Sequence, residues 1–285
     1  MKLLQKKYNV CLVQPFGYIH SGAFTELAEL VAYTLEDLGY VPSISINQTS
    51  IDSRNIIIGA HLLDVSHIKS IKSQFPSTVI LNTEQFSAIN SEWKGPLFEW
   101  ISNFETWDYS NQNINILRNK GINNIKCLGI GYQSRLNRIT KSQNQDIDIL
   151  FYGSTNDRRL KVINELKASG HNIAAIFGVY GQERDNLIAR SKVVLNLHYY
   201  DSKIFEIVRV FYLMTNSKAV VGELDAETSI NPIYLEGFYH SNYENLVASC
   251  NKLLIDNGMR EELERKANRV IQSYPQSELM KLVLE

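Results

Sequence analysis

The sequence has few cysteines and no long apolar run. Its three cysteines, Cys11, Cys127 and Cys250, lie far apart, and the chain contains no CxxC pair and no Cys/His cluster. This spacing argues against a disulfide scaffold or a zinc site and is typical of a reducing compartment. No segment approaches the ~20 apolar residues that a membrane span needs, and the N-terminus lacks the apolar stretch of a signal peptide. We therefore expect a cytoplasmic protein with no membrane span.

Neither sign of charge dominates. The 285 residues include 29 Lys and Arg against 30 Asp and Glu, which gives a formal net charge of −1 at pH 7. A cationic surface of the kind that binds nucleic-acid backbone is not a bulk property of this chain, and we expect no nucleic-acid partner. Apolar residues make up 44% and charged residues 21%, which excludes wholesale disorder, a collagen and a coiled-coil rod.

Several common catalytic motifs are absent as well. The chain has no P-loop GxxxxGK[ST], no HExxH and no GxSxG. Asp146 and Asp148 match a DxD metal-binding pair by letter, but they lie at the entry of a predicted strand, which is the wrong end for a site. We expect neither a metal ion nor another cofactor.

What the sequence does contain is an alternation of short apolar runs with longer helical patterns. This order predicts parallel sheets with helices on both faces. The polar stretch 133–146 lacks a periodic apolar face, and the pattern restarts after it, so we place a linker there. We predict an α/β protein of two Rossmann-like domains, residues 1–143 and 144–285, that face a cleft. The predicted strands are 10–14, 41–46, 55–58, 78–81, 147–152, 173–177, 193–197 and 219–221, and the clearest helices are 23–38, 160–168 and 204–214.

The turn after the first strand of the second half is a candidate anion site. Gly153 and Ser154 precede a helix start that carries Arg158 and Arg159. Backbone N–H groups, the helix dipole and the guanidinium fork all suit phosphate. Adjacent helical residues point about 100° apart, so we expect only one arginine to reach a ligand. The alternative is a helix cap followed by two solvated arginines.

The predicted helix 204–214 is apolar all round and should be buried, yet it carries Glu206 and Arg209 one turn apart. Buried charge is costly unless it is paired or bound to a ligand. One interpretation is a structural Glu–Arg ion pair; the other is that Glu206 accepts hydrogen bonds from sugar hydroxyls while Arg209 faces phosphate. Tyr180, in a glycine-containing loop after another strand, could stack on a base or a sugar.

The first half has its own candidates. Gly17 lets backbone approach a ligand after the first strand, and His20 follows where an imidazole could act as general base. Glu84 follows a strand, and Asp108 lies in the stretch 105–110 that opens a polar, helix-like segment. Either carboxylate could serve an acceptor hydroxyl, although Asp108 could equally be an N-cap.

Several blocks resemble the GT-B glycosyltransferases, and more narrowly a bacterial family related to the group-1 transferases. The blocks are WDYS (107–110), DILFYGS (148–154), YGQERD (180–185), LNLHYY (195–200) and FEIVR (205–209). The resemblance covers most of residues 10–255 and implies transfer of a sugar from a nucleotide-activated donor to an acceptor hydroxyl without a metal. The acceptor could be a saccharide, a lipid, a peptide or a small metabolite.

The resemblance also implies roles for residues. It places the donor against Gly153, Ser154, Arg158 and Arg159 at phosphate, Tyr180 near the base, and Glu206, Arg209, Glu223 and His198 around the sugar, ribose and diphosphate. Gly17 and His20 correspond to the loop of the first domain that carries a base in such enzymes. Eight residues after Glu206 the chain has Met214 instead of a second glutamate, which leaves retaining or inverting chemistry open. A non-catalytic sugar-nucleotide or glycan-binding protein and a sugar-nucleotide epimerase are the alternatives.

Overall fold

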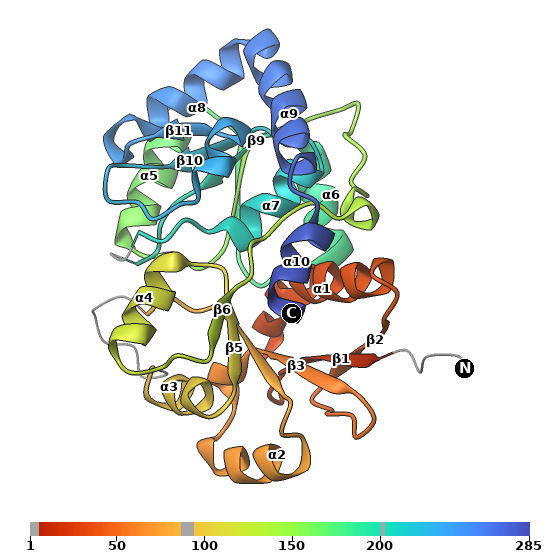
Figure 1. Ribbon diagram of the computed structural model, residues 1–285. Coiled ribbons are helices and arrows are strands. Elements are labelled where there is room, and N and C mark those ends of the chain that lie inside the picture. The colour runs from red at the N-terminus through yellow and green to blue at the C-terminus, as the bar shows by residue number, and fades with distance from the viewer. Residues whose placement is uncertain (1–5, 87–93, 201–202) are drawn as a thin grey trace. The chain divides into compact units, whose positions relative to one another are not determined.

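The chain forms two compact units, each built around one parallel sheet. The computed structural model describes residues 6–86, 94–200 and 203–285 (Figure 1). The first unit comprises Met1–Gln133 and Pro275–Glu285, and the second comprises Ser134–Tyr274. Within the described ranges no helix has the length and apolar character needed to cross a membrane.

The sheet of the first unit has the strand order β2-β1-β3-β4-β5-β6, and every neighbouring pair is parallel. Since consecutive parallel strands need crossover connections, helices cover both faces of the sheet. The carboxyl ends of the six strands lie at one edge of the sheet, and the loops that follow them carry polar side chains. The strands are β1 (Lys7–Leu12), β2 (Val41–Ile46), β3 (Arg54–Ile58), β4 (Val79–Asn82), β5 (Glu105–Asp108) and β6 (Ile125–Cys127).

The helices of this unit divide between the two faces. Helix α1 buries Leu27, Val31 and Leu35 against the sheet because these residues share one helical face. On the opposite face, Cys11, Ile57 and other strand residues join a core with α3, which contributes Trp100. The helices are α1 (Thr25–Asp37), α2 (Ile68–Gln74), α3 (Lys94–Asn103), α4 (Asn111–Asn119) and α10 (Gln276–Leu284).

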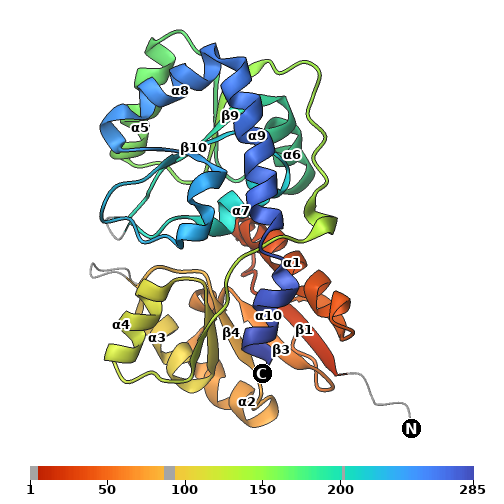
Figure 2. The same ribbon diagram turned by 45° about the horizontal axis from the view of Figure 1, so that its top comes forward.

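The second unit repeats the same plan with the strand order β11-β10-β9-β7-β8, again parallel. Helices α5 and α8 cover one face, where their apolar residues meet those of β7 and β9, while α6 and α7 lie against the opposite face (Figure 2). The elements are β7 (Ile147–Tyr152), β8 (Ile173–Ile176), β9 (Ser191–Asn196), β10 (Val220–Glu223), β11 (Tyr239–Ser241), α5 (Asp157–Ala168), α6 (Gly181–Arg190), α7 (Ile207–Thr215), α8 (Leu246–Ile255) and α9 (Asn257–Gln272).

The division of the chain differs from the predicted boundary at 143/144 in two respects. The second unit begins at Ser134, and the polar stretch that was expected to be a linker is attached to it: the Asn216 side chain accepts from the N–H groups of Arg138 and Ile139 and donates to the Leu136 carbonyl. The stretch 133–146 is polar because it is an irregular segment that makes hydrogen bonds to the second unit, and it is not a free linker.

The C-terminal helix is the other difference, because α10 belongs to the first unit. It lies beside α1 in both views (Figures 1 and 2) and buries Met280 and Val283. The Gln276 side chain accepts from the Gly131 N–H and donates to the Gly129 carbonyl at 3.0 Å. We predicted residues 144–285 as one domain because the local periodicity of a helix does not show which sheet the helix covers.

Two predicted elements also need correction. Residues 105–108 form strand β5, not a helix-like segment, because their polar side chains have partners in the sheet: Glu105 accepts from Arg54 Nη2 at 2.7 Å and from Trp107 Nε1 at 2.8 Å. The predicted helix 204–214 begins only at Ile207, so Glu206 occupies the N-cap position.

Candidate functional site

In the second unit, the carboxyl end of the sheet brings two guanidinium groups beside one glycine. Gly153 follows β7 with a φ of +135°, a conformation that side chains other than hydrogen rarely allow. A Cβ atom at this position would lie 3.0 Å from Arg209 Nη2 and 3.7 Å from Arg159 Nη1. Glycine therefore makes room for both arginines.

Arg159 is buried and holds the local backbone together. Its guanidinium donates to the carbonyl of Ser154 at 2.7 Å, to that of His198 at 3.3 Å and to that of Leu197. Burial and the neighbouring Arg209 charge lower the pKa of Arg159 to about 10, so the group stays cationic at neutral pH. Arg159 thus joins the turn after β7 to the end of β9 and adds positive charge there.

Glu206 supplies the carboxylate that lies beside Arg159. Its Oε2 accepts from Asn196 Nδ2 at 2.9 Å and lies 3.3 Å from His198 Nδ1, and its Oε1 lies 3.7 Å from Arg159 Nη2. Burial alone would raise the pKa of Glu206, but the close contact with His198 and the charges of Arg209 and Arg159 hold it below its usual value. Glu206 is therefore ionised at neutral pH.

Arg209 lies in the first turn of α7 and is partly exposed. Its Nη1 donates to Asn196 Oδ1 at 3.0 Å, and its guanidinium carbon lies 5.3 Å from the centre of the Tyr152 ring. Asn196, the last residue of β9, therefore bridges Arg209 and Glu206. The sequence interpretation missed Asn196, although a buried polar residue that ends an apolar strand was a usable signal.

Arg158 and Glu223 form a separate pair. Both Nη atoms of Arg158 donate to the Glu223 carboxylate, one of them at 2.7 Å, and the guanidinium lies 3.9 Å from the centre of the Tyr243 ring. Glu223 is buried and also accepts from the His198 N–H at 3.1 Å. Among the described side chains of this group, Arg158 and Glu223 neutralise each other, which leaves the cations Arg159 and Arg209 beside the single carboxylate of Glu206.

The remaining donor-side candidates lie around this group. Ser154 is exposed in the turn after Gly153, and His198 is buried after β9 with its Nε2 3.4 Å from Thr228 Oγ1. Tyr180 precedes the first residue of α6, beyond β8, the strand next to β7 in the sheet. The structure therefore brings Gly153, Ser154, Arg159, His198, Glu206 and Arg209 together and attaches Arg158 and Glu223 to their edge.

In the first unit, Glu84 pairs with a histidine that the sequence interpretation missed. Glu84 Oε1 lies 3.6 Å from His61 Nδ1 and accepts from Thr83 Oγ1 at 3.2 Å. The side chain of Glu84 is 18% exposed and that of His61 only 4%. Burial lowers the pKa of His61, while the Glu84 carboxylate opposes that shift. The signal for His61 was its position three residues after the end of the apolar strand 55–58.

Gly17 and His20 lie in the segment that follows β1. Gly17 has a φ of +73° in an exposed turn that the Tyr18 N–H closes on the Pro15 carbonyl at 3.0 Å. His20 lies in a 3₁₀ helix (Ile19–Phe24), with its ring edge-on to that of Tyr18. Burial and the Glu84 charge raise the pKa of Tyr18.

Asp108 is fully buried at the end of β5 and is not an N-cap, since Ser110 caps α4. Its carboxylate accepts from Asn82 Nδ2 at 2.6 Å, from the Ser110 N–H at 2.7 Å and from Asn113 Nδ2. Asn82 Oδ1 in turn accepts from the Glu84 N–H at 3.1 Å. Asp108 therefore holds the loop that carries Glu84 instead of contacting solvent.

Asp108 predicts a pH dependence of stability. Burial raises its pKa to about 7, although the donors of Asn82, Ser110 and Asn113 oppose the shift. Because the folded state then binds a proton that the unfolded state releases near pH 4, stability falls as pH rises from about 4 through about 7. We expect the free energy of unfolding of the protein, relative to Asp108→Asn, to decline by more than about 1 kcal/mol from pH 5 to pH 8. Urea titrations of both proteins measure it, and a pH-independent difference would contradict the burial argument.

A metal site finds no support in the described ranges, where no group of three His, Cys, Asp or Glu side chains lies close enough to hold an ion. The expected absence of a metal stays a prediction.

No protein-family model matches the chain. Proteins of Acanthamoeba polyphaga mimivirus are similar in sequence. Uncharacterized protein L140 is 28% identical over 243 residues, which cover 80% of this chain and 75% of that protein. Uncharacterized protein L137 is 29% identical over 140 residues, 46% of this chain but only 18% of its own length. The second alignment thus spans a small part of a longer protein.

Solved structures are similar over nearly the whole chain. WaaG, a glycosyltransferase involved in lipopolysaccharide biosynthesis, superposes with a TM-score of 0.62 at 11% identity and covers 96% of this chain and 97% of its own. Anabaena HepE in complex with UDP gives 0.58 at 10% identity, with 98% and 99% covered. T4 phage BGT in complex with its UDP-glucose substrate gives 0.56 at 13% identity, with 98% and 97% covered. These likenesses confirm the predicted fold: the chain has the two Rossmann-like domains of the GT-B glycosyltransferases.

Proposed function

We propose that this chain is a glycosyltransferase that moves a sugar from a nucleotide-activated donor to an acceptor hydroxyl. The observation that carries the proposal is the pair of guanidinium groups beside Gly153, set against one carboxylate at the carboxyl end of a parallel sheet. Ligands of open α/β sheets gather at this edge, and excess positive charge there selects an anion. The GT-B fold and the UDP-containing similar structures make a nucleoside diphosphate the anion to test first.

Arg209 is the residue that we assign to the diphosphate. It is partly exposed, and Asn196 holds its Nη1, so the planar fork is oriented before a ligand binds. Charge develops on the leaving diphosphate in the transition state, and a fixed guanidinium stabilises that charge without reorganisation. Arg159 adds its positive charge from a buried position beside Gly153, and its hydrogen bond to the Ser154 carbonyl fixes the turn of Gly153 and Ser154.

Glu206 suits a different part of the donor. It is ionised and its side chain is 13% exposed, so it can accept hydrogen bonds from sugar or ribose hydroxyls. Tyr180 retains its proposed place near the base. Glu223 and Arg158 act on the site through His198, whose N–H Glu223 fixes. We assign them positioning roles.

Glu84 is the group that we assign to the acceptor hydroxyl. Of the three predicted catalytic residues, Asp108 is fully buried, whereas Glu84 is partly exposed and has a histidine behind it. The carboxylate would accept the hydroxyl proton as the sugar is transferred, which is general base catalysis. His61 orients Glu84 through the 3.6 Å contact at Nδ1, and His20 remains the alternative base.

The reaction is tested by incubating the protein with a panel of UDP-, GDP- and ADP-sugars. We expect release of one nucleoside diphosphate, dependent on an added acceptor. Saccharides, lipids, peptides and small metabolites form the acceptor arms; duplex DNA is included because the DNA modifying enzyme beta-glucosyltransferase has a similar structure. Arms with EDTA and with Mn²⁺ test metal independence, since BGT has also been crystallised with UDP and Mn²⁺. Isomerised donor would indicate an epimerase, and binding without turnover a non-catalytic protein; either result overturns the proposal.

A further inference from the structure

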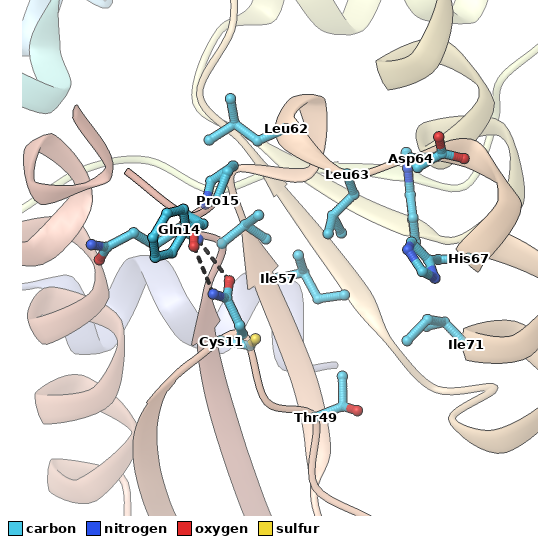
Figure 3. Close-up of a pocket in the computed structure, with 14 residues that line it drawn as sticks. Cys11, Gln14, Pro15, Thr49, Ile57, Leu62, Leu63, Asp64, His67 and Ile71 are labelled. Carbon is cyan, nitrogen blue, oxygen red and sulfur yellow. Dashed lines mark hydrogen bonds between the residues drawn. The ribbon is translucent and has the colours of Figure 1, made fainter. Parts of the chain in front are cut away.

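The first unit contains a cavity of about 500 Å³ that includes none of the predicted site residues. It lies where β1, β2 and β3 end, between the loops at 14–16 and 47–49 and the segment 62–71 (Figure 3). Trp100 of α3 completes its wall. Small-molecule sites commonly have volumes of about 300–1,000 Å³, so this cavity is large enough for a ring system or a short chain.

The wall of the cavity is mainly apolar. Among the described residues that line it, none is a lysine or an arginine, and its carboxylate, Asp64, already accepts from the Ser66 N–H at 2.8 Å. Its histidine, His67, is exposed and interacts with the charge of Asp64, so an anionic ligand would lose hydration, would gain no lysine or arginine partner and would meet the Asp64 carboxylate. The apolar contributors are Val13, Ile57, Leu62, Leu63, Ile71 and Trp100.

The loop at one side of the cavity is held in place by Asn47. The Gln14 N–H donates to Asn47 Oδ1 at 2.7 Å, and Asn47 Nδ2 donates to the Gln14 carbonyl at 2.6 Å; Figure 3 draws both bonds. Asn47 makes them from a φ of +55°, which few residues other than glycine and asparagine adopt. This arrangement fixes the cavity wall before any ligand arrives, which reduces the entropy lost on binding.

Phe16 belongs to this loop, lines the cavity and has a fully exposed side chain. An aromatic side chain can bury 150–250 Å² of surface, and the hydrophobic free energy of that burial is not gained while the ring stays in water. A ligand in the cavity would cover part of the ring. The exposed Phe16 and the apolar wall thus favour the same kind of ligand.

We propose that this cavity binds the uncharged, apolar group of a small molecule. If the proposed transferase function holds, that group is the apolar part of the acceptor; the binding itself does not depend on transfer.

Calorimetry on the full chain without nucleotide tests the binding. The probes are 2-naphthalenemethanol, the straight-chain alcohol 1-octanol and 2-naphthoate, which keeps the naphthalene ring but carries a charge. We expect the naphthyl alcohol to bind at least tenfold more tightly than 2-naphthoate. The octanol arm shows whether the apolar group is a ring or a chain.

Two variants locate the binding. Thr49→Trp fills the cavity from its rim and should weaken binding of the naphthyl alcohol by at least tenfold. Gln48→Trp, at the adjacent exposed residue outside the lining, should leave that affinity unchanged. Leu62→Arg places a cation in the wall and should reverse the preference towards 2-naphthoate. A thermal melt establishes that each variant is folded.

Equal affinity for the alcohol and the carboxylate would overturn the proposal. So would undiminished binding to folded Thr49→Trp, or no binding of either alcohol at millimolar concentration. Because nucleotide is absent, each of these results is separate from a failure of the transferase panel.

Discussion

Glu84→Gln is expected to reduce the acceptor-dependent turnover of the protein by about 10²- to 10⁴-fold, the usual contribution of a general base. Glutamine keeps the size of the side chain and can still accept from Thr83, but it cannot take a proton. The affinity for nucleoside diphosphate should not change, because Arg209 and the other donor-side residues belong to the second unit. Turnover with saturating donor and calorimetry with nucleoside diphosphate measure the two quantities.

Three further variants make this test specific. Glu99→Gln, on the exposed side of α3, is the matched control and should be fully active. His61→Gln should lower kcat less than Glu84→Gln and leave nucleotide affinity intact, because His61 acts through Glu84. If His20→Ala loses turnover while Glu84→Gln keeps it, the base is His20 and our assignment is wrong.

Arg209→Ala is expected to weaken nucleoside diphosphate binding by about 10- to 100-fold, which corresponds to the loss of charge-assisted hydrogen bonds worth about 1.5–3 kcal/mol. The thermal midpoint should fall less than in Arg159→Ala, because Arg209 is partly exposed and its described hydrogen bond is to one acceptor, Asn196 Oδ1. Titration calorimetry with UDP, GDP and ADP measures the affinity and identifies the base.

Two other arginines calibrate the result. Arg265→Ala, on an exposed face of α9, should change neither affinity nor stability. Arg159→Ala should lower stability markedly, because it leaves three carbonyl acceptors at a buried position without their donor. If Arg209→Ala lowered the thermal midpoint as Arg159→Ala does and left nucleotide affinity unchanged, Arg209 would be a structural cation.

Much of the fold could be predicted from the sequence because strand periodicity and turn residues are local. The strands at 41–46 and 147–152 have the predicted bounds, and Asn156 caps α5 as a polar residue before a helix should. The C-terminal helix could not be assigned, because α10 has the same apolar periodicity whichever sheet it covers. Its unit depends on Gln276 and Gly131, which are 145 residues apart.

The candidate site was predictable by residue type more than by role. Adjacent arginines at a helix start indicated an anion site, and the expectation that they diverge is consistent with the structure, where Arg159 is buried and Arg158 pairs with Glu223. The sequence could not show that pairing, because it joins residues 65 positions apart. Asn196 and His61 each end or follow an apolar strand, which marks them as candidates, but their roles depend on partners on other elements that the sequence does not show.

The placement of α10 has a consequence for biosynthesis. A ribosome releases the six strands of the first sheet before any residue of the second unit, but the helix that lies beside α1 emerges only after Tyr274. Part of the apolar surface of the first unit, which α10 covers in the finished protein, therefore stays exposed while the whole second unit is translated. The half that is synthesised first is the half that is completed last.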